Sequence, residues 1–291
     1  MPKTIITHDG KFHADDVFAV SALALLEPEA KVVRTRDSKQ ISEGDFVVDV
    51  GGVYEPEANR FDHHQQNGAG VRGNGIPYAA FGLVWKNFGE KICGSAEVAS
   101  RVEEVLVVPI DANDNGIDLS TPRFAGISLY SVSDAVRSFI PTFEEKGVSQ
   151  DERFLEVSRF AKRILEREIE RAKALVRGVE KVRASYASSP DKRLVVLDSD
   201  YSWKDTLAGF TEPIYVVHLQ DETWRLYCVR NDPHLFVNRK DLPESWAGLR
   251  DAKLVEITGV PDAIFCHRNR FMAVAKSKEG ALALANLALN F

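Results

Sequence analysis

The stretch Thr7-His-Asp-Gly-Lys-Phe-His-Ala-Asp-Asp16 follows a short run of β-branched residues and leads into an apolar helical pattern. A second polar cluster, Arg60-Phe-Asp-His-His64, comes after a buried apolar run that ends in Asp49. The two clusters place four of the chain's 7 histidines beside carboxylates. Imidazole and carboxylate are ligands that suit borderline divalent metal ions, so this pattern indicates a metal site.

The sequence around these clusters alternates short strand patterns with helical ones. We expect strands at Thr4–Thr7, Lys31–Arg34 and Gly44–Val50, helices at Asp15–Leu26 and Pro77–Phe88, and a further helical pattern from about Ser95. This alternation predicts a parallel sheet with right-handed crossovers, in which ligands gather at the carboxyl ends of the strands. Because His8 and Asp49 each end a strand, the polar clusters should meet at that edge. The glycines of Asn67–Gly75 favour a mobile loop after the second cluster.

The second half of the chain follows a different pattern. Apolar residues recur at helical spacing from Asp151 to about Ser185, which predicts one long amphipathic helix or two joined near Glu168. Strand patterns follow at 194–197, 214–219, 224–229 and 254–257, and a last helix is expected at Lys278–Leu289. We therefore expect an α/β protein with a metal-binding domain at 1–150, a helical linker at 151–189 and a smaller α/β domain at 190–291.

The bulk composition narrows the class of protein. The chain has 291 residues, of which 44% are hydrophobic and 27% charged, as in ordinary globular proteins. A net charge of -6 argues against a broad electrostatic grip on duplex nucleic acid but leaves short strands and nucleotides open. Three widely spaced cysteines (Cys93, Cys228, Cys266) and the absence of a leader pattern favour the cytoplasm. No apolar run reaches the roughly 18 residues that a membrane span needs.

Residues near the strand ends are the candidate metal ligands. A carboxylate closing a buried strand, as Asp49 does, is costly unless it is paired, which favours a cation beside it. On a loop that leads into a helix, His8, His13 and Asp15 can converge on one point. Successive side chains of an extended segment point apart, so at most one of His63 and His64 should bind a given ion.

The stretch Asp111-Ala-Asn-Asp-Asn-Gly116 supplies further carboxylates. Asp111 is a ligand candidate because it directly follows the apolar stretch Val105–Ile110, and Asp114 is a weaker one. The alternative is that Asp111, Asp114 and Asp118 are turn formers around Asn115-Gly116. A cysteine-rich structural zinc site is excluded by composition, and the ligand set is richer in aspartate than a typical structural site.

Five blocks of sequence, in order, resemble the MYG (melanocyte proliferating gene) family, which was formerly labelled metal-dependent protein hydrolase. They are Thr7–Asp16, Val33-Arg-Thr-Arg-Asp37, Val47-Val-Asp-Val-Gly-Gly52, Phe61-Asp-His-His-Gln65 and Asp111–Gly116. C-terminal matches at Trp246–Arg250, Gly259, Phe265–His267 and Lys278–Ala281 extend the resemblance over most of the chain. It implies a DHH-type phosphoesterase fold for the N-terminal domain, and the family's eukaryotic member acts as a 3′→5′ RNA exonuclease.

The resemblance also implies a division of roles. One ion would take His8, His13 and Asp49, and a second would take Asp15, Asp49, His63 and Asp111. Manganese is the expected metal, since it is the usual one in the superfamily. Magnesium, zinc and cobalt stay open as alternatives, because His13 stands where many superfamily members have an aspartate, which lowers the negative charge of the site. Around the ions, Asp16 and Asp62 would orient ligands and His64 would contact the substrate or leaving group. In the second domain, Arg230, Arg250 and His267 would hold phosphate and sugar, unless the two arginines only form surface salt bridges.

These observations predict a divalent-metal-dependent phosphodiester hydrolase, a 3′→5′ exonuclease on short single-stranded RNA that uses two ions to activate a bridging water. Two alternatives stay open. The same site could act on pyrophosphate, a cyclic dinucleotide or another nucleotide ester. The chain could instead be a non-catalytic binding module stabilised by metal. A homodimer through the long helix, and closure of the Asn67–Gly75 loop over substrate, are also left open.

Overall fold

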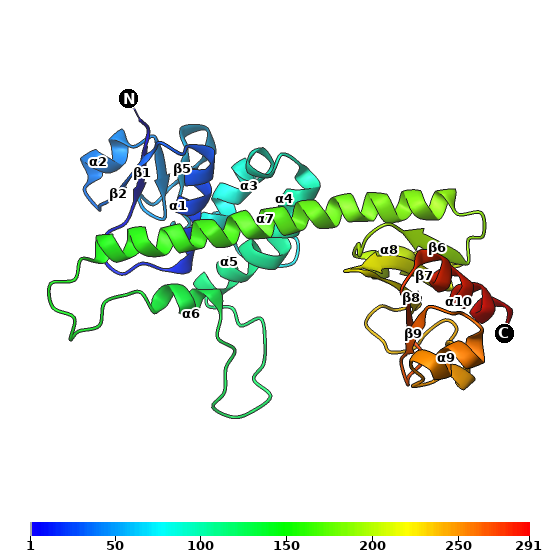
Figure 1. The fold of residues 1–291 in the computed structure, drawn as a ribbon. Coiled ribbons are helices and arrows are strands. Elements are labelled where there is room, and N and C mark those ends of the chain that lie inside the picture. The colour runs from blue at the N-terminus through cyan, green and yellow to red at the C-terminus, as the bar shows by residue number, and fades with distance from the viewer. Residues whose placement is uncertain (1) are drawn as a thin grey trace. The chain divides into compact units, whose positions relative to one another are not determined.

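The structure, a computed structural model, describes residues 2–291. The described residues form a mixed α/β protein with two five-stranded sheets. The chain divides into two compact units, unit 1 at Met1–Lys173 and unit 2 at Ala174–Phe291. In Figure 1 the elements of unit 1 run from blue to green, and the sheet and helices of unit 2 run from yellow-green to red.

The sheet of unit 1 has the strand order β2-β1-β3-β5-β4. Its strands are β1 (Thr4–Thr7), β2 (Lys31–Arg34), β3 (Phe46–Val48), β4 (Tyr54–Glu55) and β5 (Arg60–Phe61). β1 is parallel to β2 and β3, and β3 is parallel to β5, whereas the edge strand β4 runs antiparallel to β5. The first two predicted strands are confirmed and the third is shorter than expected. The sheet is mixed, and the carboxyl ends of β1 and β3 lie side by side.

Short helices surround this sheet. They are α1 (Ala14–Leu26), α2 (Ser38–Glu43), the 3-10 turn η1 (Pro56–Ala58), α3 (Ala80–Cys93), α4 (Ala96–Val102), the π-helical turn η2 (Glu103–Val107), α5 (Val108–Asp114) and α6 (Val132–Arg137). The helix predicted at Asp15–Leu26 is confirmed as α1, and every residue from Ala14 to Leu23 is buried. It packs against α3, where the Phe18 and Phe81 ring centroids are 5.5 Å apart. A helix that is apolar on all sides lies in a core in this way.

The long helix α7 spans Gln150–Ser188 without a break, so the first of the two sequence alternatives is confirmed (Figure 1). In unit 1, Phe154 is buried against Phe12, and the Ser21 hydroxyl donates to the Ser158 carbonyl over 3.0 Å. Farther along the helix, Val182 belongs to a buried cluster of unit 2. α7 therefore contributes core residues to both units. The domain limits expected at 150 and 189 stay a prediction.

The sheet of unit 2 has the order β6-β7-β8-β10-β9. Its strands are β6 (Leu194–Leu197), β7 (Tyr215–Gln220), β8 (Thr223–Cys228), β9 (Ala263–Cys266) and β10 (Met272–Ala275), and its helices are α8 (Trp203–Ala208), the 3-10 turn η3 (Glu244–Trp246), α9 (Asp251–Thr258) and α10 (Lys278–Asn290). β6 and β7 are parallel and the other neighbours are antiparallel. The strands predicted at 194–197, 214–219 and 224–229 and the last helix are confirmed.

The strand predicted at 254–257 is wrong, because these residues lie in α9. Four residues, three of them apolar, are too few to separate a strand from one turn of helix. Gly259, with a φ of 70°, caps the carboxyl end of α9 in the left-handed conformation that helix ends favour. The prediction also missed β9 and β10.

The two faces of the unit 2 sheet bury different clusters. On one face, residues of β7, β8, β9 and β10 pack against α9 and α10, with Leu226, Ala273 and Leu284 among the fully buried ones. On the other face, Val195, Val216 and Val229 pack against α7 and α8. Within residues 2–291, that second buried cluster takes no member from β9 or β10. The three cysteines are free and buried. None of the helices described for residues 2–291 has the length and apolarity to cross a membrane.

Candidate metal centre

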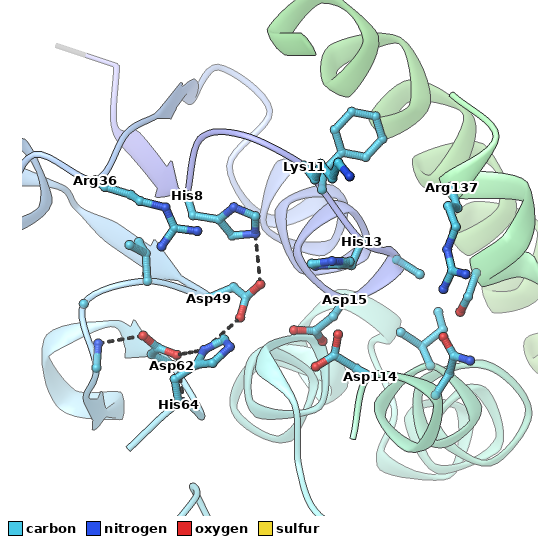
Figure 2. A pocket seen from close by; sticks show the side chains of 18 residues that line it. His8, Lys11, His13, Asp15, Arg36, Asp49, Asp62, His64, Asp114 and Arg137 are labelled. Atoms are coloured by element: carbon cyan, nitrogen blue, oxygen red, sulfur yellow. Dashed lines mark hydrogen bonds and ion pairs between the residues drawn. The ribbon is translucent and has the colours of Figure 1, made fainter. Parts of the chain in front are cut away.

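A pocket of about 640 Å³ opens where β1 and β3 end. Its walls come from the loops that follow those two strands and from α1, α5 and α6 (Figure 2). The strand order explains this position, because adjacent parallel strands leave their carboxyl ends open at one edge of a sheet. The sequence prediction that His8 and Asp49 meet there agrees with this arrangement: the two side chains approach within 3.3 Å.

The first group of potential ligands contains His8, His13, Asp16 and Asp49, each offering one atom within 4.8 Å of the others. His8 Nε2 lies 3.3 Å from Asp16 Oδ2 and 3.3 Å from Asp49 Oδ2. Its other ring nitrogen, Nδ1, is 2.9 Å from the Asp9 carbonyl. A proton on Nδ1, donated to that carbonyl, leaves the Nε2 lone pair for a metal ion.

A second group contains Asp15, His63 and Asp114. His63 Nε2 lies 3.2 Å from Asp114 Oδ2 and 3.4 Å from Asp49 Oδ1. Figure 2 shows the carboxylates of Asp15 and Asp114 close beside each other, below His13. A third, overlapping group contains Asp49, His63 and His64. Asp49 thus stands between the two outer groups.

Backbone hydrogen bonds hold the buried carboxylates of Asp15 and Asp16 in place, whereas an unusual backbone conformation places Asp49. Asp15 accepts the backbone N–H groups of Ala80 and Phe81, at 2.9 and 2.7 Å, and so caps the amino end of α3 from α1. Asp16 accepts the N–H groups of His13 and Val17, at 2.7 and 2.9 Å, at the start of its own helix. Asp49 follows β3 with a φ of 53°, a left-handed conformation that aspartate tolerates better than most residues.

These groups shift one another's protonation strongly. Burial raises the pKa of Asp16 to about 7, and burial with the charge of Asp49 raises the pKa of Asp15 well above its usual value. Burial acts in the same direction on Asp49, but the imidazoles of His63 and His8 hold its pKa well below the usual range. Burial would lower the pKa of His63, yet Asp114 and Asp49 raise it to about 11.

The donor set fits a divalent cation. Asp16 Oδ2, Asp49 Oδ1 and His63 Nε2 are buried and have no hydrogen-bond partner. Buried polar atoms are rarely left unpaired, and buried carboxylates are costly without a compensating charge. Histidine nitrogens and carboxylate oxygens together suit manganese, zinc and related ions. These atoms are therefore the ones that a bound ion would satisfy.

Asp62 and His64 form a pair at the rim. Asp62 accepts the N–H of Gly52 at 2.6 Å, and its other oxygen is 2.8 Å from His64 Nδ1. The side chain of His64 is 62% exposed, so it faces the pocket and solvent. The pair is shown at the left of Figure 2. Asp62 therefore holds an accessible imidazole, and its expected role in orienting metal ligands stays a prediction.

Asp111 lies apart from the three groups. It is fully buried, and its Oδ2 is 2.7 Å from Arg72 Nη1, while its Oδ1 accepts the Gly82 N–H at 3.0 Å. A side chain at position 82 would collide with Asp111 and Arg72, so this approach requires glycine. Burial raises the pKa of Asp111 to about 7, although Arg72 acts in the opposite direction. Asp114, the weaker candidate, is the residue that lies beside His63.

Three cations that the sequence reasoning did not single out also line the pocket: Lys11, Arg36 and Arg137. Lys11 lies between the two histidines of the first cluster, Arg36 in the second sequence block, and Arg137 at the end of α6. Arg36 Nε is 3.3 Å from Asp9 Oδ1. Lys11 and Arg36 could have been identified as candidates from their position inside the blocks that resemble the family. The sequence around Arg137 contains no comparable motif.

The three residues expected to hold substrate all belong to unit 2. Arg230 lies at the end of β8, where it bridges to Asn238, and its guanidinium is 4.8 Å from the Phe236 ring centroid. Arg250 precedes α9 and lies 4.2 Å over the ring of Phe265. The rings of His267 and Phe271 are 4.4 Å apart. Among residues 2–291 neither arginine forms an ion pair, and each lies against an aromatic ring.

Fold and site together define an α/β protein with a histidine–carboxylate centre suited to divalent cations. The chain belongs to the MYG1 exonuclease family, described as Uncharacterised protein family UPF0160, whose family model matches residues 4–289. It is 32% identical to the MYG1 exonuclease of Homo sapiens, over 99% of this chain and 86% of that protein. The MYG1 proteins of Schizosaccharomyces pombe and Chlamydia trachomatis are 30% and 31% identical, each over 99% of this chain and 97% of the relative.

Proposed function

We propose that this chain is a divalent-metal-dependent phosphodiester hydrolase that removes nucleotides from the 3′ end of short single-stranded RNA. The observation that carries the proposal is the charge layout of the pocket. Asp15, Asp49, Asp114 and His8 form its floor, with the buried Asp16 and the half-buried His63 beside them, and three cations line its wall. Such a floor repels a phosphodiester unless cations neutralise it. The names of the mammalian relatives support exonuclease activity.

We propose two ion sites. One uses His8, His13 and Asp49 with Asp16 behind them, and the other uses Asp15, His63 and Asp114, with Asp49 between the two sites. Asp114 replaces Asp111 in this assignment because it lies 3.2 Å from His63. Manganese is the first choice of metal for this donor set. When bound, such ions lower the pKa of water and neutralise charge that develops on phosphate oxygens. The placement of ligands at the ends of parallel strands also supports a DHH-type layout for unit 1.

The remaining groups of the pocket have assignable tasks. Lys11, Arg36 and Arg137 would bind the non-bridging oxygens of the scissile phosphate and of its neighbour. His64 is held through Nδ1 by Asp62, which leaves Nε2 toward the substrate. When water attacks the phosphorus, the bond to the 3′-oxygen of the preceding nucleotide breaks. Doubly protonated His64, with its Nδ1–H held by Asp62, gives its Nε2 proton to that oxygen, and the proton lost by the attacking water passes through solvent to restore it.

The test uses a short RNA labelled at its 5′ end, incubated with the protein and manganese and resolved on a gel. We expect a ladder of products shortened from the 3′ end, and a 3′-labelled copy should release labelled mononucleotide first. An Asp49→Asn variant keeps the side-chain shape but loses the charge, and its rate of RNA cleavage should fall by at least about a hundredfold.

Intact RNA after incubation with the native protein would contradict the proposal. Phosphate release from pyrophosphate or cleavage of a cyclic dinucleotide in the same samples would then identify the substrate of the site. Bound metal without hydrolysis of any of these compounds would point to a binding module.

A further inference from the structure

Six rings form a continuous series across one face of the unit 2 sheet. We call them the ring row: Trp203, His218, Tyr227, Phe271, His267 and Phe265. His218 and Tyr227 are stacked, with an angle of 1° between their planes and 5.4 Å between centroids. Tyr227 and Phe271 are also stacked at 6.2 Å, and Phe271 is followed by His267 at 4.4 Å. The series therefore runs from α8 across β7 and β8 toward β9 and β10.

The two ends of the ring row differ in solvent exposure. Trp203, the first residue of α8, and His218 of β7 are buried, at 5% and 1% exposure. Tyr227, Phe271, His267 and Phe265 are half-buried. Tyr227 is paired in register with Met272 of β10, and Val274 of β10 is paired with Phe265 of β9, so this part of the face is formed by neighbouring strands. The buried cluster on this face stops before those strands.

A hollow lies at the middle of the ring row. Its lining combines three rings with two cations and contains no carboxylate: Trp203, Lys204, Tyr227, Cys228, Arg230, Pro233 and Phe271. The segment after Pro233 exposes Leu235, Phe236 and Val237, at 56%, 90% and 70%. Arg230 lies over Phe236, and Arg250 lies over Phe265 at the other end of the row. The chain as a whole has a net charge of -6, but this hollow has two cations and no carboxylate in its lining. Its local charge is therefore positive and favours an anion.

We propose that the ring row and its hollow bind single-stranded RNA, with bases stacked on Tyr227 and Phe271 and phosphates held by Lys204 and Arg230. Aromatic side chains beside cations are the usual means by which proteins bind single strands, because every base offers a π-face. A peptide would find few backbone partners beside Tyr227, since β8 is an interior strand that is already paired with β7 and β10. The choice of RNA rests on the proposed function, and the surface extends the roles expected for Arg230, Arg250 and His267.

The experiment measures the binding of a labelled short RNA by fluorescence anisotropy. It is done with manganese in the Asp49→Asn background, so that the RNA is bound but not consumed. Tyr227→Leu and Phe271→Leu should each weaken binding by about fivefold or more, and the loss should persist at high salt. Tyr227→Phe and Phe271→Tyr keep the rings and should retain the affinity, which separates stacking from a folding defect. Tyr186→Leu is the matched control, because it removes a ring that stacks on Phe210 at 4.0 Å, on the covered part of the same face.

The outcomes separate this inference from the proposed function. Bis(p-nitrophenyl) phosphate, a small diester without nucleobases, reports on the metal centre in the native background. If the Leu variants bind RNA as tightly as their parent, the ring row does not bind RNA and the inference fails, whatever the diester assay gives. If RNA binding requires the rings but neither RNA nor the diester is hydrolysed, the inference stands and the proposed function fails. The inference would also fail if an unlabelled peptide displaced the labelled RNA and unlabelled RNA did not.

Discussion

Asp111 and Asp114 lie three residues apart on α5, and their side chains have different partners. Asp111 points into the core toward Arg72 and the amino end of α3, whereas Asp114 lies beside His63 in the pocket. A carboxylate that is already paired with a guanidinium has little negative charge to offer a metal ion. The two residues should therefore respond differently to the same replacement.

Asp114→Asn should reduce activity by roughly a hundredfold and weaken metal binding, because it removes a charged ligand. Asp111→Asn should retain bound metal but leave Arg72 buried without its partner, with a loss of stability of about 3 kcal/mol. Metal content by elemental analysis and urea unfolding measure the two effects. Loss of metal in Asp111→Asn with full metal in Asp114→Asn would restore Asp111 as the ligand.

The residues that the sequence could predict are those placed by the sheet. His8, His13, Asp15, Asp49 and His63 follow or flank strands whose order is implied by alternating patterns, so their convergence could be anticipated. Asp114 and Arg137 stand on short helices whose orientation depends on tertiary packing, such as the close approach of Asp111 to Gly82. No periodicity in the sequence encodes that approach.

At the scale of elements, α6 is a short helix that presents Ser133 and Arg137 to the pocket. With six residues it has little intrinsic stability, and it depends on its amino-terminal cap. Ser131 Oγ accepts the Asp134 N–H at 3.2 Å, and Asp134 Oδ2 accepts the Ser131 N–H at 2.9 Å. This reciprocal cap sets the position of Arg137.

Ser131→Ala should destabilise α6 by about 1 kcal/mol and raise KM for RNA severalfold, with little change in metal content. Ser131→Thr keeps the cap and should behave as the native protein. Ser138→Ala, at the other end of the same helix, removes one exposed bond to the Ala135 carbonyl and is the matched control. Steady-state kinetics would contradict this role for the cap if Ser131→Ala left KM unchanged.

At the scale of the whole molecule, the two units should respond to pH in opposite directions once metal is removed. In unit 1, burial raises the pKa of Asp16 and of Asp111 to about 7, so their folded forms favour the proton. In unit 2, burial lowers the pKa of His218 below 6.5, so its folded form disfavours the proton. His218 faces Asp200, Arg225 and Lys204, and its Nε2 has no hydrogen-bond partner.

Raising the pH from about 5 to about 7 should therefore destabilise unit 1, because its unfolded carboxyls release protons that the folded ones retain. The same change should stabilise unit 2 up to about pH 6.5, since unfolding below that pH protonates His218. Each group contributes up to about 1.4 kcal/mol per pH unit. Calorimetry with a chelator should show the two transitions moving apart or crossing. A His218→Phe variant should lose the gain in unit 2, and transitions that shift together would refute the assignment.

The left-handed backbone at Asp49 has a consequence for substitution at this position. A φ of 53° limits which side chains can branch close to the main chain, while the proposed ion sites on both sides of Asp49 require a negative charge. These two demands rank replacements in opposite orders. Glutamate keeps the charge but suits the backbone poorly, whereas asparagine and glycine suit the backbone but lack the charge. Aspartate is the residue type that satisfies both, so what is usually regarded as the mildest exchange of one acid for another is here a severe one.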